Sequence, residues 1–119
     1  ALLFGGTMSQ IGYFEAGRIA FICVTREQLK AADATSDVTE GFIDFPLSVD
    51  GVEVAVCLLE TADNRFKISL RSKGKTDVNA VAAVYGGGGH ILASGCMISG
   101  CLEEVIDKLC YTIRQHLID

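Results

Sequence analysis

The sequence predicts one small α/β domain over residues 1–119, with a mixed β-sheet of about five strands and flanking helices. Short apolar segments with strand character alternate with segments of helical periodicity. Neither an internal repeat nor a proline- or serine-rich linker divides the chain. Half of the 119 residues are hydrophobic, which is enough to build a core for a domain of this length.

The first half of the chain predicts a hairpin and two short helices. Apolar residues occupy both phases of residues 18–25, as in a buried strand, and the loosely alternating residues 7–14 are expected to pair with it. Thr25 is a favourable N-cap for the first helix. The second helix is expected within residues 34–47, where Pro46 should end it because proline cannot continue a helix interior.

The second half predicts a pair of strands, then a helix, a strand and a final helix. Residues 52–61 are apolar on both phases, which indicates a strand covered on two faces. Residues 65–72 alternate, so that Lys67, Ser69 and Arg71 should share the polar face. The later elements are expected as a helix capped by Asp77 and ending at Gly86, a strand at residues 93–98, and a helix starting at Ser99 or Gly100.

Charge and cysteine content exclude several classes of protein. The net charge of −5 argues against a protein that coats DNA or RNA, although five of the ten Lys and Arg residues fall within residues 65–75. That cluster is either a solvated strand and turn or a local phosphate-facing patch. The five cysteines lack the spacing of zinc or redox motifs, which favours a reduced, cytoplasmic setting. No apolar run has the length of a membrane helix.

Four consecutive glycines, Gly86, Gly87, Gly88 and Gly89, are followed directly by His90. Such a run costs backbone entropy, and a chain accepts it where the backbone must approach something closely or take positive φ angles. We expect a loop whose successive N–H groups bind an anion, with the histidine as an added donor. The competing interpretation is a flexible linker between a helix and a strand. The run matches neither a Walker loop nor a dinucleotide fingerprint.

The stretch YGGGGHILASG at residues 85–95 resembles the signature of the DHH-associated C-terminal domain of DHH phosphoesterases. The longer stretch SLRSKGKTDVNAVAAVYGGGGH at residues 69–90 is similar to the nano-RNase and pAp-phosphatase branch of that RecJ-like family. The segments GRIAFICVT and VTEGFIDFPLSVDGVEVAVCLLE also resemble that branch. The resemblance therefore extends over nearly the whole chain.

This resemblance implies a two-domain Mn²⁺-dependent enzyme that hydrolyses short oligoribonucleotides or 3′-phosphoadenosine 5′-phosphate. In the family, an N-terminal DHH domain holds the Mn²⁺ ions and the C-terminal domain binds the nucleotide. The chain has only His90 and His116 and no Asp-His-His triplet. We therefore expect it to correspond to the C-terminal domain alone, without a metal site and inactive by itself. A homodimer of the full-length enzyme is a further expectation.

The same resemblance assigns roles to individual residues. Arg71 would bind a substrate phosphate in a bidentate manner. The four glycines would present backbone amides to the phosphate nearest the scissile bond, and His90 would act in catalysis by stabilising the charge that develops there. Four residues are expected at the entrance or border of the cleft: Ser72, Lys75, Thr39 and Glu40. Ile91 and Leu92 stand where relatives often carry a basic residue.

Two other functions stay open on the sequence. The first is a cyclic-dinucleotide phosphodiesterase, whose members carry a similar glycine–histidine loop but tend to have a polar segment after it. The second is a non-enzymatic RNA-binding module like the related C-terminal domain of alanyl-tRNA synthetases. The acidic net charge weighs against a large tRNA partner.

Overall fold

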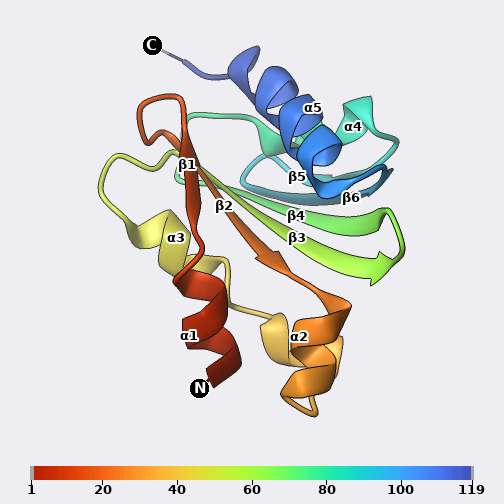
Figure 1. Ribbon diagram of the computed structural model, residues 1–119. Helices are drawn as coiled ribbons and strands as arrows, with labels where there is room; N and C mark the ends of the chain where they lie inside the picture. Colours follow the sequence, from red (N-terminus) through yellow and green to blue (C-terminus); the bar gives the residue numbers. More distant parts are fainter. Residues whose placement is uncertain (1, 119) are drawn as a thin grey trace.

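The computed structural model describes residues 2–118, which form a single mixed sheet of six strands with helices on both faces (Figure 1). The strand order across the sheet is β1-β2-β3-β4-β6-β5. The strands are β1 Gly12–Phe14, β2 Ile19–Val24, β3 Val54–Ala62, β4 Arg65–Ser72, β5 Gly88–His90 and β6 Ala93–Ser99. The helices are α1 Leu2–Met8, α2 Arg26–Ala31, the 3₁₀ helix η1 Ser36–Thr39, α3 Asp44–Ser48, α4 Val78–Val84 and α5 Leu102–Arg114.

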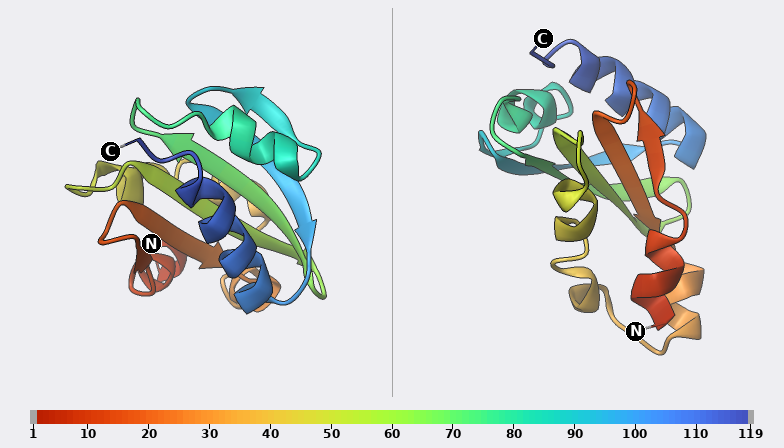
Figure 2. Two further views of the ribbon diagram at one scale, coloured as in Figure 1. Left: turned by 90° about the horizontal axis from the view of Figure 1, so that it is seen from above. Right: turned by 90° about the vertical axis from the view of Figure 1, so that its left-hand side faces the viewer.

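The sheet is mixed because one pair of neighbours is parallel. Strands β2 and β3 run parallel, and every other pair of neighbours is antiparallel. Antiparallel neighbours can be joined by short turns, but the parallel pair needs a crossover. That crossover contains α2, η1 and α3, and α2 and α3 lie apart from each other on the side of the sheet away from α5 (Figures 1 and 2).

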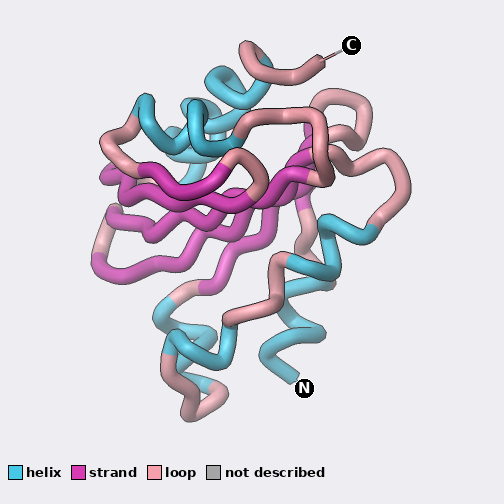
Figure 3. The backbone as a smooth tube through the Cα atoms, turned by 180° about the vertical axis from the view of Figure 1, so that it is seen from behind, coloured by secondary structure: helices cyan, strands magenta, loops and turns pink. Residues whose placement is uncertain are grey.

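The two faces of the sheet are covered to different extents. Helices α4 and α5 lie over one face and close the main core, which contains Val56, Leu58, Ile68 and Leu70 from the two central strands. On the other face, α1 and α3 pack against β2 and α2 packs against β3 (Figure 3). This second face carries a smaller core around Ile22 and Ile43. The exposed side chains of Lys67 and Met97 mark the part of the second face that the helices leave open.

Local sequence signals explain the starts of α2 and α4. Thr25 caps the start of α2, as the sequence predicts, and it forms a capping box with Gln28. Asp77 accepts a hydrogen bond from the Ala80 N–H at the start of α4, which confirms its predicted role as a cap. The last helix begins after Cys101, close to the predicted start.

Two predictions in the first half are wrong. Residues 7 and 8 belong to α1 and not to a strand, so that β1 begins only at Gly12. Pro46 lies inside α3 and does not end the helix before it. It occupies the first turn, where a backbone N–H has no partner within the helix, so proline costs little there.

No helix within residues 2–118 is long and apolar enough to span a membrane.

Candidate functional site

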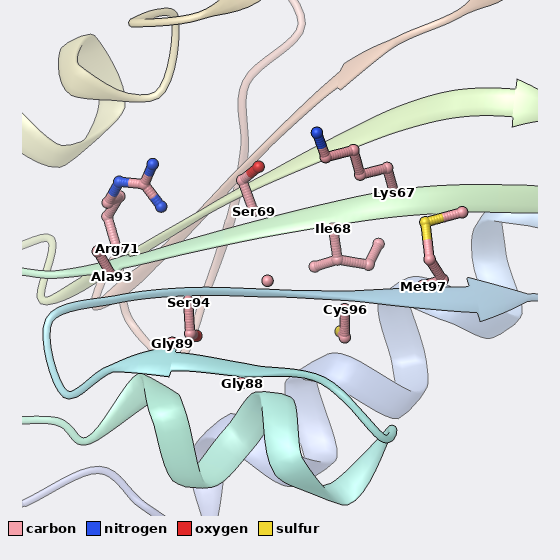
Figure 4. Close-up of a pocket in the computed structure, with 11 residues that line it drawn as sticks. Lys67, Ile68, Ser69, Arg71, Gly88, Gly89, Ala93, Ser94, Cys96 and Met97 are labelled. Carbon is pink, nitrogen blue, oxygen red and sulfur yellow. The ribbon is translucent and has the colours of Figure 1, made fainter.

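The alternation of β4 places three polar side chains on the open part of the second face. Phe66, Ile68 and Leu70 are buried under the helices on the first face, whereas Lys67, Ser69 and Arg71 point to the opposite side (Figure 4). This confirms the predicted assignment of the two faces of β4. The three polar side chains line a hollow of about 520 Å³.

The strand register continues this hollow across β6 and β5. Arg71 is paired with Ala93, and Ala93 is paired with His90 on the other side. In the next row, Ser69 is paired with Gly95, and Gly95 with Gly88. The two rows therefore place small residues in the middle, and Gly88, Ala93 and Gly95 all line the hollow. The result is a strip of nearly bare backbone beside the Arg71 guanidinium.

The glycine run is not the free loop that the sequence predicts. Helix α4 already ends at Val84, and Tyr85 is its C-cap. Gly86 has a φ of 80°, and its N–H donates to Ala83 O at 3.1 Å, while the Gly87 N–H donates to Ala82 O at 3.0 Å. These two bonds form a Schellman motif, which explains why a glycine follows the cap. The run then enters β5, which pairs with β6 at the edge of the sheet. With β5 the sheet has six strands, where the sequence predicts about five.

Close packing explains two more of the glycines. A Cβ atom at Gly87 would lie 2.1 Å from Gly95 O, and a Cβ at Gly89 would lie 2.6 Å from Ala93 O. Neither side chain could fit without moving β6. Gly88 differs, because the nearest heavy atom to an added Cβ is Asn79 Oδ1 at 3.4 Å. Packing within the chain therefore leaves room for a side chain at Gly88, which is also one of the glycines that line the hollow.

The predicted row of free backbone amides is only partly present. The N–H groups of Gly86 and Gly87 cap α4, and the Gly89 N–H donates to Asn79 Oδ1 at 2.9 Å. At least three of the four amides are thus engaged inside the chain, and Gly88 is itself paired with Gly95 of β6. The glycines contribute to the hollow mainly by lacking side chains, and whether any of them contacts a phosphate remains a prediction.

Arg71 is the best-placed cation of the hollow. It is half-buried, and its Nη1 donates to Leu70 O at 2.9 Å. This hydrogen bond holds one of the two terminal nitrogens of the guanidinium in place. Within residues 2–118, neither Arg71 nor Lys67 forms an ion pair with a carboxylate. A guanidinium without a carboxylate partner retains donors for an anion, and its fork geometry suits a phosphate.

The other predicted site residues are not all brought together. Ser72 is buried on the face opposite Arg71, where its Oγ accepts from the Gly74 N–H at 3.2 Å. Lys75 is exposed and lines a separate hollow beside Gly51 and Lys73. His90 is exposed at the end of β5, in the same row as Arg71 but not in the wall of the hollow. Their binding roles stay predictions, and the geometry favours Arg71 over Ser72 and Lys75.

A second hollow of about 400 Å³ adjoins the first. Its walls again include Lys67, Ser69 and Arg71, and its far side includes Thr39 and Glu40. The sequence predicted the last two at the border of a cleft, and the structure places them across the groove from β4. Ser69 received no role from the sequence, and Lys67 was considered only as one of the basic residues of a possible phosphate-facing patch, although the alternation of residues 65–72 already placed both beside Arg71.

The described residues do not form a metal site. Among residues 2–118, no group of three or more His, Cys, Asp or Glu side chains could hold a metal ion. Burial raises the pKa of the Cys57 thiol from 9.0 to about 11, so this thiol is protonated at neutral pH. Cys57 is buried in the smaller core, and Cys23 is half-buried against the main core.

Most of the chain matches the model of one known domain family. The model of the DHHA1 domain matches residues 19–118, which is most of the chain. The chain belongs to the DHHA1 domain family. Membership confirms the predicted DHH-associated C-terminal domain, and the glycine strip of β5 and the Arg71 end of β4 both lie inside the matched range.

Curated relatives of this DHHA1 domain are named as bifunctional enzymes. The chain is 38% identical over 76 residues to the probable bifunctional oligoribonuclease and PAP phosphatase NrnA of Streptococcus mutans. It is 28% identical over 116 residues to the bifunctional oligoribonuclease and PAP phosphatase NrnA of Thermus thermophilus. These matches cover 64% and 97% of the chain but only 24% and 34% of the relatives. The DHHA1 domain thus spans about a third or less of the proteins it matches.

Solved structures show the same fold. An exopolyphosphatase-related protein from Bacteroides fragilis superposes with a TM-score of 0.86 and 32% identity, over 96% of this DHHA1 domain and 34% of that chain. The pGpG-specific phosphodiesterase PggH from Vibrio superposes with a TM-score of 0.64 and 16% identity, over 96% of this chain and 38% of its own. The second likeness shows the fold alone.

Proposed function

We propose that this DHHA1 domain is the substrate-binding part of a phosphoesterase that acts on short oligoribonucleotides or 3′-phosphoadenosine 5′-phosphate. The observation that carries the proposal is the Arg71 guanidinium, which forms no ion pair with a carboxylate within residues 2–118 and lines the same hollow as the bare strip of Gly88, Ala93 and Gly95. The names of the relatives from Streptococcus mutans and Thermus thermophilus support the substrate class.

In this proposal the phosphate enters the hollow between β4 and β5. Arg71 binds two of its oxygens, and the absence of side chains at Gly88 and Gly95 lets the phosphate approach the backbone. His90, at the end of the same row, donates a hydrogen bond to the phosphate and stabilises charge that develops there. The domain thereby binds and orients the substrate but does not itself break the bond.

Bond cleavage is assigned to a DHH domain outside this chain. The described residues offer no cluster for Mn²⁺, so the ions of the proposed enzyme would be held by that partner domain. The open part of the second face, which includes Arg71, is where such a domain would close over the nucleotide. Five free cysteines support a reducing, cytoplasmic setting for the assembled enzyme.

The proposal is tested by titrating this chain with a 5′-phosphorylated diadenylate, using isothermal titration calorimetry. We expect binding that weakens at least about tenfold in Arg71→Met, since a charge-assisted bidentate contact is removed. Arg65→Met is the matched control, because Arg65 is exposed at the other end of β4 and does not line the hollow. The control should bind like the wild type.

Equal losses in the Arg71 and Arg65 variants would contradict the proposal, because they would indicate general charge attraction. A gel shift with tRNA separates the RNA-binding alternative. Tight, salt-sensitive binding to tRNA, together with no binding to the diadenylate, would favour an RNA-recognition module over a substrate-binding domain.

A further inference from the structure

The outer side of α1 presents no polar side chain to solvent. Leu2, Gly5 and Gly6 are exposed and share one side of the helix, whereas Thr7 on the inner side is buried. Leu2 is 93% exposed. Residues 1–14 include no Lys, Arg, Asp or Glu. A surface helix of a soluble domain normally turns charged or polar residues towards water, and α1 does not.

The last helix shows the usual arrangement in the same domain. Helix α5 buries Val105, Leu109 and Ile113 on its inner side. Its exposed side carries charged residues, among them Glu103, Glu104, Asp107 and Lys108. The uncharged outer side of α1 is therefore a local feature and not a property of the whole surface.

Two glycines weaken α1 without a reason inside the described chain. Gly5 and Gly6 are not among the residues with positive φ, and an added Cβ at either would meet no heavy atom within 4 Å. Glycine is a poor helix former, and a helix of only seven residues is not stable alone in water. A pair of glycines is favourable where another part of the protein must approach the helix closely.

Apolar surface continues on both sides of α1. On one side, the Phe4 ring packs edge-on against Phe42 and Phe45, with ring centroids 5.2 Å and 6.0 Å apart. Phe45 is still 48% exposed. On the other side, a hollow of about 270 Å³ lies between α1 and α2, and no charged side chain among the described residues lines it. We define the α1 surface as Leu2, Phe4, Gly5, Gly6, Ala31 and Phe45.

The size of the α1 surface favours a partner on the same polypeptide. Its central helix is seven residues, or about 10 Å, long. A stable complex between separate proteins usually buries about 800 Å² on each partner, which is more than one such helix offers. A small contact suffices when a covalent link keeps the partner at high effective concentration. About two thirds of the Thermus thermophilus relative lie outside the part that this chain matches, since the match covers 34% of it.

The α1 surface and the Arg71 hollow belong to the same face of the sheet. Helix α1 packs against β2 on the second face, and Arg71 points to the open part of that face (Figures 3 and 4). A domain of twice this chain's length has a radius of gyration of about 18 Å and is about 45 Å across. The longest dimension of this chain is 41 Å. Such a domain is wide enough to rest on α1 and still cover the hollow.

We propose that the α1 surface is the docking site of the DHH domain that the proposed function assigns to a region outside this chain. Leu2, Phe4 and Phe45 would be buried against an apolar patch of that domain, and the two glycines would let it approach the α1 backbone. The contact would position the DHH domain in front of the open part of the second face. This inference rests on the proposed function for the identity of the partner.

The first test measures hydrogen exchange of α1 by mass spectrometry, in this chain alone and in the full-length enzyme. Docking should slow the exchange of the amides of residues 2–8 by at least about tenfold in the full-length enzyme. The amides of α5, on the opposite face, should exchange equally in both proteins and serve as the control. Equal exchange of α1 in the two proteins overturns the inference.

The second test uses Ala31→Glu, which adds a charge to the hollow between α1 and α2. Because Ala31 is exposed, the variant of this chain should unfold in urea like the wild type. In the full-length enzyme the variant should lose most of the slowing at α1, because docking would bury an unpaired charge.

Ala83→Glu is the matched control for this variant. Ala83 is also an exposed alanine near the end of a short helix, but α4 lies on the opposite face of the sheet. The control should leave the exchange of α1 unchanged in the full-length enzyme. An equal loss of slowing in both variants, or no loss in Ala31→Glu, overturns the inference.

A second copy of this chain is the competing occupant of the α1 surface. Sedimentation equilibrium of this chain should show a monomer, because the surface is small. A dimer that Ala31→Glu dissociates and Ala83→Glu does not would assign the surface to a second copy and overturn the inference. The proposed function fails separately, through unchanged binding of the diadenylate in Arg71→Met, whatever the exchange of α1 shows.

Discussion

Arg71 and His90 stand at the two ends of one row across three strands, with Ala93 as the single residue between them. Neighbouring strands lie about 4.8 Å apart, so the backbones of the two residues are separated by roughly 10 Å. The methyl group of Ala93 is the only side chain in the middle of the row. An anion can therefore contact donors from both ends only because this position is small.

The size of residue 93 should control ligand binding more than folding. Ala93→Leu adds a larger side chain to the wall of the first hollow, of about 520 Å³, where Ala93 is only half-buried. We expect affinity for the phosphorylated diadenylate to fall about tenfold, while the urea midpoint changes little. Met97→Leu, on the same strand and face, conserves volume and should bind normally. Unchanged binding in Ala93→Leu would show that the ligand does not lie on this row.

Gly87, Gly88 and Gly89 should respond differently to alanine. Gly87→Ala and Gly89→Ala place a Cβ within 2.1 Å and 2.6 Å of carbonyl oxygens of β6, so each should lower the free energy of unfolding by about 1–3 kcal/mol or more. Gly88→Ala has room and should cost less than about 1 kcal/mol. Urea denaturation followed by circular dichroism measures all three. Equal losses would mean that β5 does not approach β6 as described.

The fold of the second half was largely predictable because its signals are local. The alternation in residues 65–72 identified β4 with its bounds and its two faces, and Asp77 marked the start of α4. The glycine run was misinterpreted as a loop, since short-range patterns do not show which glycines are required by a neighbouring strand. Contact with β6 at Gly87 and Gly89 is a tertiary reason that only the structure reveals.

The composition of the site was predictable only in part. Arg71 and the glycine run were both singled out, and Arg71, Gly88 and Gly89 line one hollow although β6 lies between their strands. Ser72 adjoins Arg71 in sequence, but the pleat turns it to the opposite face, into the core. The second hollow, of about 400 Å³, is lined by residues near 37, 57 and 69, and the crossover between β2 and β3 brings these residues together. No pattern within a single segment contains that information.

Asn79 ties α4 to the edge strand and should control how often β5 opens. Its Oδ1 accepts from the Gly89 N–H at 2.9 Å, on a strand of only three residues. Asn79→Ala removes this acceptor and should cost about 0.5–1.5 kcal/mol, with faster hydrogen exchange at Gly89 than at residues of β4. Asn79→Asp keeps an acceptor at this place and is the control. Equal exchange at Gly89 in Asn79→Ala and the wild type would contradict the role of this bond.

The buried thiols should make the fold sensitive to alkaline pH. Burial raises the pKa values of Cys23, Cys57, Cys96 and Cys110 from 9.0 to about 11. The unfolded chain therefore loses these protons first, and the linked stability is fully present below pH 9 and lost as pH rises towards about 11. Urea unfolding at a series of pH values with a non-thiol reductant measures this decline.

Cys57→Ala isolates one thiol from the lysines and tyrosines that also titrate at high pH. The variant should be less stable at pH 7, because it loses the packing of the buried Cys57 side chain beneath the second hollow. Its stability should nevertheless fall less steeply than that of the wild type as the pH rises above 9, since one raised pKa is gone. Parallel curves for the two proteins would show that the Cys57 thiol has the same pKa in the folded and unfolded chains. Water would then reach Cys57 more readily than its burial indicates.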